Sequence, residues 1–155
     1  DKYLGSYEQI ANALRKYSTN PGLDVVNFFE HVLFSFLTCN ADMHLKNFSL
    51  LKQPEVGYIL SPAYDMVATA LVNPADNEEL ALPLNGKKRR IDWGDFVALF
   101  DGQKLHRKQQ LNIFSKMENA ESEWRRFIDF SFLSDELKAS LMNLIRDRFA
   151  RIKAG

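Results

Sequence analysis

Six polar residues in two short segments carry groups that could do chemistry together. The first segment, TCNADMHLKN, contains Asn40, Asp42, His44, Lys46 and Asn47, and the second, SPAYD, ends in Asp65. Phosphoryl transfer by a kinase uses an Asp that orients the attacking hydroxyl, an Asn five residues later that binds Mg²⁺, and a second Asp from another segment that also binds the metal. Asp42, Asn47 and Asp65 have these types in this order. We therefore predict a catalytic Asp42 and a magnesium site at Asn47 and Asp65.

The remaining polar residues of the first segment have a less specific interpretation. His44 and Lys46 could neutralise charge on the phosphoryl group during transfer, and we include both as candidate catalytic residues. A solvated loop tip, or a His that keeps the loop in shape through a hydrogen bond, fits them equally well. Asp and Asn in loops usually hold turns through their own side chains, so the spacing alone leaves that simpler interpretation open for Asp65 too.

A buried helix is expected directly before the polar loop. Apolar residues between Val25 and Leu37 cover so wide an arc that this helix must be buried almost all round. After the loop, the runs 48–51 and 58–60 flank a Pro- and Gly-containing turn and predict a short hairpin. The hairpin would return the chain so that Asp65 lies near the loop.

The remaining segments predict further helices and a second hairpin. Ser6 and Gln9 have the spacing of a capping box for a first helix that ends near Ser18. Asn85-Gly86 resembles a hairpin turn between the runs 80–84 and 89–91. Later helices are expected after Asp92, over 108–117 and from Ser134. We predict an α+β fold that is mostly α-helical, with small β-hairpins near the catalytic loop.

Composition limits the class of protein. The 155 residues suffice for one domain with a large core, which we place at 1–155, and 20 basic residues balance 20 acidic ones. A neutral chain is unlike proteins that bind DNA or membranes mainly by charge attraction. The only cysteine, Cys39, excludes an internal disulfide and borders the buried helix, so we interpret it as a small core residue. The chain has no apolar run near the about 20 residues of a membrane helix, and we expect a cytoplasmic protein without membrane contact.

Three runs of the sequence resemble a known family. GSYEQIA, FFEHVLFSFLTCNADMHLKNFSLL and YILSPAYDMV are similar to the C-terminal, catalytic-lobe part of the HipA-type toxin kinases, whose loop reads N-x-D-x-H-x-K-N-F-S and whose metal Asp stands in P-x-Y-D. The resemblance implies a fold related to protein-kinase-like and phosphoinositide-3-kinase-like enzymes. It also implies that Asp42 is the catalytic Asp and that Asn47 and Asp65 are the metal ligands.

The resemblance implies an activity and partners as well. Members of this family are bacterial serine/threonine kinases that use ATP with Mg²⁺, phosphorylate a protein hydroxyl and target an aminoacyl-tRNA synthetase. A DNA-binding antitoxin binds them, and through this antitoxin they would contact DNA indirectly. The family places its phosphate-cradling loop and adenine site in a preceding N-terminal region, and no glycine-rich loop occurs among the seven glycines here. We therefore expect a fragment that is inactive by itself.

Other functions remain open at this stage. The chain could be a non-catalytic module that binds the antitoxin or DNA, although such a module has no need of Asp42, Asn47 and Asp65 together. It could also be a lipid or small-molecule kinase of the phosphoinositide-3-kinase-like group, which differs in its acceptor. The basic run Lys87 to Arg90 is interpreted as an exposed connection between strands, away from the metal site.

Overall fold

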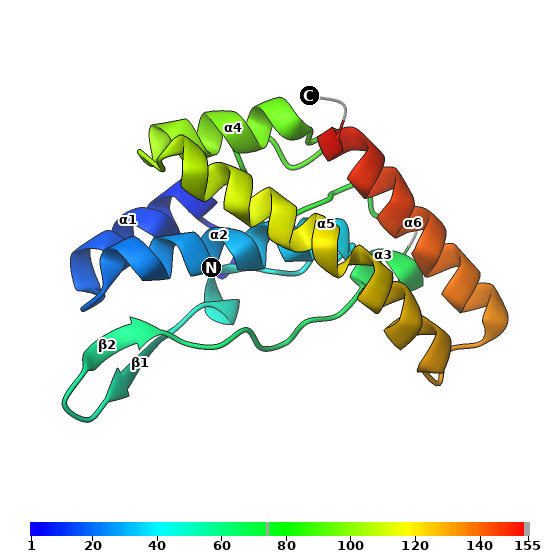
Figure 1. Cartoon of the computed structure of the whole chain (residues 1–155), viewed down its shortest axis with the longest axis horizontal. Coiled ribbons are helices and arrows are strands. Elements are labelled where there is room, and N and C mark those ends of the chain that lie inside the picture. Colours follow the sequence, from blue (N-terminus) through cyan, green and yellow to red (C-terminus); the bar gives the residue numbers. More distant parts are fainter. Residues whose placement is uncertain (74, 154–155) are drawn as a thin grey trace.

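The computed structural model of the chain describes residues 1–73 and 75–153, and Figure 1 shows how their elements are arranged. In chain order these are α1 (Tyr7–Tyr17), α2 (Pro21–Leu37), the 3-10 turn η1 (Leu45–Asn47), β1 (Leu50–Gln53), β2 (Gly57–Leu60), α3 (Thr69–Val72), α4 (Trp93–Gly102), α5 (Arg107–Phe130) and α6 (Asp135–Lys153).

Helix α2 forms the centre of the fold, as its apolar pattern predicts. Its side chains at Phe28, Phe29, Val32, Leu33 and Phe36 are completely buried. The helix contacts α1, β2, α5 and α6, so it is covered from several directions. Burial on this scale fixes the position of the helix, because each large apolar side chain removed from water contributes about 1.5–3 kcal/mol.

Local capping signals place the starts of two helices as predicted. The Ser6 side chain accepts a hydrogen bond from the Gln9 N–H at 3.3 Å at the start of α1. Asp92 does the same for the Asp95 N–H at 3.2 Å, and α4 begins at the next residue, Trp93. In both cases a side-chain oxygen satisfies an N–H group that has no partner inside the helix.

The first predicted hairpin is confirmed, with its first strand displaced by two residues and its second strand longer by one. Strands β1 and β2 pair antiparallel, from Leu50 opposite Leu60 to Gln53 opposite Gly57. The hairpin is joined to the core by Asp24 of α2, which is buried. Its carboxylate accepts hydrogen bonds from the Leu60 N–H at 2.9 Å and from the Ser18 hydroxyl. One side chain thus connects the end of α1, the first turn of α2 and β2.

The second predicted hairpin, over 80–91, is wrong. Asn85 and Gly86 do form a turn with positive φ, of 49° and 74°, but only an isolated bridge between Leu84 and Lys87 flanks it in the described residues. Side chains from elsewhere in the chain bind backbone N–H groups that a second strand would use for pairing. The Ile91 N–H, for example, donates to the Glu79 carboxylate at 2.9 Å, and Glu79 is also ion-paired with arginines of α6.

The helical C-terminal half is confirmed, with one boundary corrected. Helix α5 extends from Arg107 to Phe130 and is much longer than the predicted 108–117. Five of the twelve residues in its second half, 119–130, are charged, and an ion pair joins Arg125 and Glu121 one turn apart. The described chain is therefore mostly helical with a single two-stranded antiparallel sheet, so the expected α+β class holds with one hairpin in place of several.

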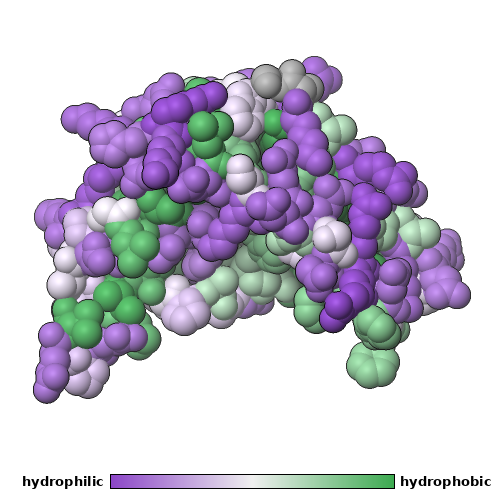
Figure 2. All heavy atoms as spheres, in the orientation of Figure 1, coloured by the Kyte–Doolittle hydropathy of each residue, from purple (hydrophilic) through white to green (hydrophobic). Residues whose placement is uncertain are grey.

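Exposed apolar side chains lie mainly at two ends of the molecule. Figure 2 shows a largely hydrophilic face with apolar atoms gathered over the hairpin end and over the turn between α5 and α6. Near that turn, Phe127, Phe130 and Phe132 are 66%, 79% and 108% exposed. No helix in the part of the chain that the structure describes is long and apolar enough to cross a membrane.

The Asp24 contacts generate a stability prediction. Asp24→Ala removes the acceptor of the buried Leu60 N–H and should lower the free energy of unfolding by about 1–3 kcal/mol, the cost of a buried donor without a partner. Asp24→Asn keeps an oxygen acceptor and should cost less. Urea unfolding of the 155-residue chain, followed by circular dichroism, measures both. Asp129→Ala, at an exposed site of α5, is the matched control with an expected change within about 0.5 kcal/mol. Equal stability of Asp24→Ala and the control would contradict the prediction.

Candidate active site

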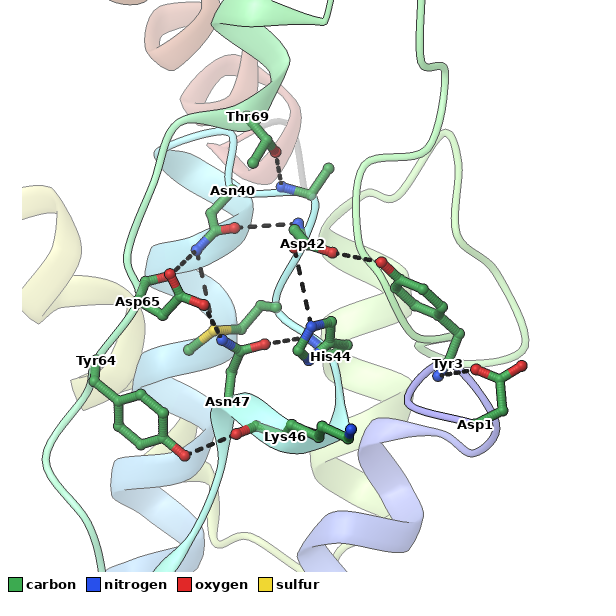
Figure 3. Close-up of polar contacts among 12 residues, drawn as sticks. Asp1, Tyr3, Asn40, Asp42, His44, Lys46, Asn47, Tyr64, Asp65 and Thr69 are labelled. Carbon is green, nitrogen blue, oxygen red and sulfur yellow. Dashed lines mark hydrogen bonds and ion pairs between the residues drawn. The ribbon is translucent and has the colours of Figure 1, made fainter.

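The polar loop begins where the buried helix α2 ends. Cys39 adopts a positive φ of 61°, which turns the chain away from the helix axis directly after Thr38. Asn40 then holds the loop from inside, since it is buried and its side-chain oxygen accepts a hydrogen bond from the Asp42 N–H at 3.1 Å. The Ala41 N–H donates to the Thr69 hydroxyl of α3 at 2.8 Å. The loop is therefore fixed from both sides (Figure 3).

Asn47 and Asp65, the two predicted metal ligands, are in direct contact. The Asn47 side-chain amide Nδ2 donates to Asp65 Oδ2 at 2.7 Å, although 18 positions separate these residues. The Asn47 Oδ1 accepts from the His44 N–H at 3.1 Å, which fixes the amide orientation. Asp65 has a positive φ of 56°, a conformation that Asp tolerates better than most residues, and its backbone oxygen accepts from Asn40 Nδ2 at 3.5 Å. The hairpin thus returns the chain to the loop as the sequence predicts.

The contact itself is made by the Asn47 amide nitrogen, so Asn47 would bind Mg²⁺ through Oδ1, which here accepts the His44 N–H. A carboxylate and an amide oxygen are hard oxygen ligands, and Mg²⁺ is commonly bound through one or two such protein groups, with water and substrate phosphate completing its octahedron. Asp65 is exposed, so its carboxylate can reach an ion from solvent, whereas the buried Asn47 is held rigidly behind it. Within residues 1–73 and 75–153 no three His, Cys, Asp or Glu side chains are grouped to hold a metal.

Asp42 lies in the same loop and faces an open cavity. Its side chain is 46% exposed, and Oδ1 accepts a hydrogen bond from the Tyr3 hydroxyl at 2.9 Å. Asp42 and Tyr3 form part of the wall of a cavity of about 550 Å³, which also contacts α3 and the segment that contains Asp76 and Glu78. A hydroxyl group that entered this cavity could reach the Asp42 carboxylate.

His44 and Lys46, the two remaining predicted residues, differ in their placement. His44 is buried, and its Nε2 lies 3.9 Å from Asp42 Oδ2, beyond hydrogen-bond distance. Lys46 is exposed and forms no ion pair with any residue that the structure describes. Its backbone oxygen instead accepts a hydrogen bond from the Tyr64 hydroxyl at 2.9 Å. The structure therefore brings His44 to Asp42 and leaves the Lys46 ammonium free in solvent.

Several residues that support the site were missed in the sequence. Tyr3 contacts Asp42 from a segment 39 positions away, and Thr69 holds the loop backbone from α3. Tyr7 of α1 donates its hydroxyl to the Met43 backbone oxygen at 2.9 Å, and burial raises the pKa of this phenol. No motif marks these positions, because their roles depend on which distant segments the fold brings to the loop.

Lys2 lies near the acidic residues of the loop. Contact with the Tyr3 hydroxyl, followed by the nearby charges of Asp42 and Asp65, raises the pKa of Lys2 above its ordinary value. Lys2 is also anchored at its backbone, where its oxygen accepts from the Leu45 N–H at 3.2 Å. The first residues of the chain therefore lie against the polar loop.

The basic run at Lys87 to Arg90 is only partly where it was predicted. Lys87, Arg89 and Arg90 are exposed, as expected, but they do not connect strands. Lys88 is half-buried, forms an ion pair with Glu78 at 3.2 Å, and lines the cavity that Asp42 faces. The expectation of an exposed run is therefore wrong for Lys88, although the cavity that it lines includes neither Asn47 nor Asp65.

Cys39 is confirmed as a core residue. It is completely buried, and burial raises the pKa of its thiol, so the unreactive protonated form is favoured.

Comparison with known proteins gives relatives that are much longer than this chain. A protein of Haemophilus influenzae named "Putative kinase" is 34% identical over 80 residues, covering 51% of this chain and 23% of its own length. Y4dM of Sinorhizobium fredii, which has the same designation, is 40% identical over 65 residues, or 42% of this chain and 15% of its own. The chain thus spans less than a quarter of either relative.

A solved structure and a family model match most of the chain. The fold superposes on a chain in the complex of HipA, HipB and operator DNA from Shewanella oneidensis MR-1, with a TM-score of 0.77, 22% identity, and coverage of 97% of this chain and 36% of that one. Residues 1–124 match the family model for the HipA-like C-terminal domain. With four-fifths of its residues matched, and with the loop and the P-x-Y-D segment in contact, this chain belongs to the HipA-like C-terminal domain family.

Proposed function

We propose that this chain supplies the catalytic loop and the metal ligands of an ATP-dependent serine/threonine kinase that acts as the toxin of a toxin–antitoxin pair. The observation that carries the proposal is the 2.7 Å contact between Asn47 and Asp65 beside Asp42. Family membership and the kinase designation of the relatives support the same conclusion.

Each residue has a defined role in this proposal. Asp42 orients the acceptor hydroxyl and accepts its proton, from a position at the wall of the open cavity. Asn47 and Asp65 hold Mg²⁺, which neutralises charge on the phosphates of ATP when it is bound. His44 packs behind Asp42 and limits its movement, and Lys46 offers a mobile positive charge to the phosphoryl group.

The acceptor and the partner follow from the family. We propose a protein Ser or Thr as acceptor, with an aminoacyl-tRNA synthetase as the first candidate target. The solved relative is in complex with HipB and operator DNA, and a comparable DNA-binding antitoxin is the proposed partner here. The neutral charge of this chain is consistent with DNA contact through that partner.

The first prediction concerns the catalytic residues in the full-length protein. Asp42→Ala should lower the rate of phosphate transfer from ATP to protein by about 100- to 10,000-fold, since it removes the group that receives the proton. Asp65→Ala should lower the rate comparably and raise the Mg²⁺ concentration needed for half-maximal activity. Transfer of radiolabelled γ-phosphate to purified synthetase, and to the protein itself, measures the effect.

A matched variant controls for the loss of a carboxylate. Asp129→Ala removes an exposed carboxylate from α5, on an element that contributes no residue to the site, and should retain full activity. Near wild-type rates in both Asp42→Ala and Asp65→Ala would overturn the proposed function.

The second prediction concerns the 155 residues alone. They contain the proposed metal ligands and no glycine-rich loop to surround the phosphates, so they offer only part of a nucleotide site. Calorimetric titration of Mg-ATP into this chain should therefore show no saturable binding at micromolar concentrations, and incubation with ATP should give no autophosphorylation. Tight binding would show that the chain is sufficient for nucleotide recognition and that this part of the account is wrong.

A further inference from the structure

Asp42 has few contacts that fix its direction. Among the described residues its carboxylate accepts one side-chain hydrogen bond, from the Tyr3 hydroxyl at 2.9 Å. His44 Nε2 lies 3.9 Å from the other oxygen, Oδ2, beyond hydrogen-bond distance. A half-exposed carboxylate on a loop can rotate about its terminal torsion, which has a broad energy profile. Tyr3 is therefore the side chain that determines where Asp42 Oδ2 points.

Tyr3 is itself held in place by several contacts. The Tyr3 N–H donates to the Asp1 carboxylate at 3.1 Å, and the preceding residue, Lys2, accepts the Leu45 N–H. The Tyr3 ring meets the His44 ring edge-on, with centroids 5.4 Å apart and an interplanar angle of 77°. Figure 3 shows the Tyr3 hydroxyl directed at Asp42 from the side opposite Asp65. The ring and the backbone thus position the hydroxyl independently of its bond to Asp42.

We propose that Tyr3 is a positioning residue for the reaction: its hydroxyl binds Asp42 Oδ1 and leaves Oδ2 to face the acceptor hydroxyl. This inference rests on the proposed function, because it assigns Asp42 the role of receiving the acceptor proton. Phosphoryl transfer depends mainly on positioning and charge, and a small misplacement of a reacting group can lower a rate strongly.

The test uses the full-length protein with Tyr3→Phe, which removes the hydroxyl and keeps the ring against His44. Since a hydrogen bond to a charged group is involved, kcat should fall about 10- to 100-fold. The KM for ATP and the melting temperature should not change, because Tyr3 is 44% exposed and its hydrogen bonds are with Asp1 and Asp42, not with the proposed metal ligands. Tyr3→Leu removes the ring as well and should be at least as impaired in kcat.

Tyr17→Phe is the matched control, because Tyr17 is an exposed tyrosine on α1 and its hydroxyl forms no hydrogen bond with a described residue. It should leave kcat unchanged. A Tyr3→Phe variant with wild-type kcat would overturn the proposal. A variant whose KM for ATP and melting temperature change together would also overturn it, because a purely structural anchor would give that result. If the wild-type protein transfers no phosphate, both this inference and the proposed function fail. If the wild type is active and Tyr3→Phe is equally active, only this inference fails.

Discussion

The contact between Asn47 and Asp65 is the constraint on which the rest of the site depends. The two side chains meet at 2.7 Å only because the chain leaves the loop, forms the β1–β2 hairpin and returns alongside it. The hairpin is itself held on the core, mainly because β2 packs against α2. Any displacement of the returning segment would separate the two proposed metal ligands.

The core explains how the polar loop, residues 38–47, is held in place. Helix α2 is buried along almost its whole length and ends directly at the loop, so the start of the loop cannot move. The buried Asn40 and Asn47 replace the hydrogen bonds that regular structure would give to the loop backbone. Buried amides of this kind are costly unless they are satisfied, and here they bond to the loop and to the returning segment.

Much of the fold and the site can be predicted from the sequence, where the signals are local. The caps at Ser6 and Asp92, the buried helix and the spacing of Asp42 to Asn47 each depend on neighbouring residues. The second hairpin failed because the Ile91 N–H bonds to the Glu79 carboxylate, which is paired with arginines of α6, and no local pattern reveals these contacts. Tyr3 was missed for the same reason: its role comes from a contact across 39 positions, and a tyrosine in an irregular segment carries no signal of its own.

The position of the metal tests the central claim most directly. Nuclear magnetic resonance of the isotopically labelled 155-residue chain with Mn²⁺ and ATP detects even weak binding, because the paramagnetic ion broadens nearby signals. The account predicts selective loss of the amide signals around Asn47 and Asp65 at low Mn²⁺, and loss of this effect in Asp65→Ala. Broadening centred on the carboxylates at Asp76 and Glu78, with the loop signals intact, would contradict it.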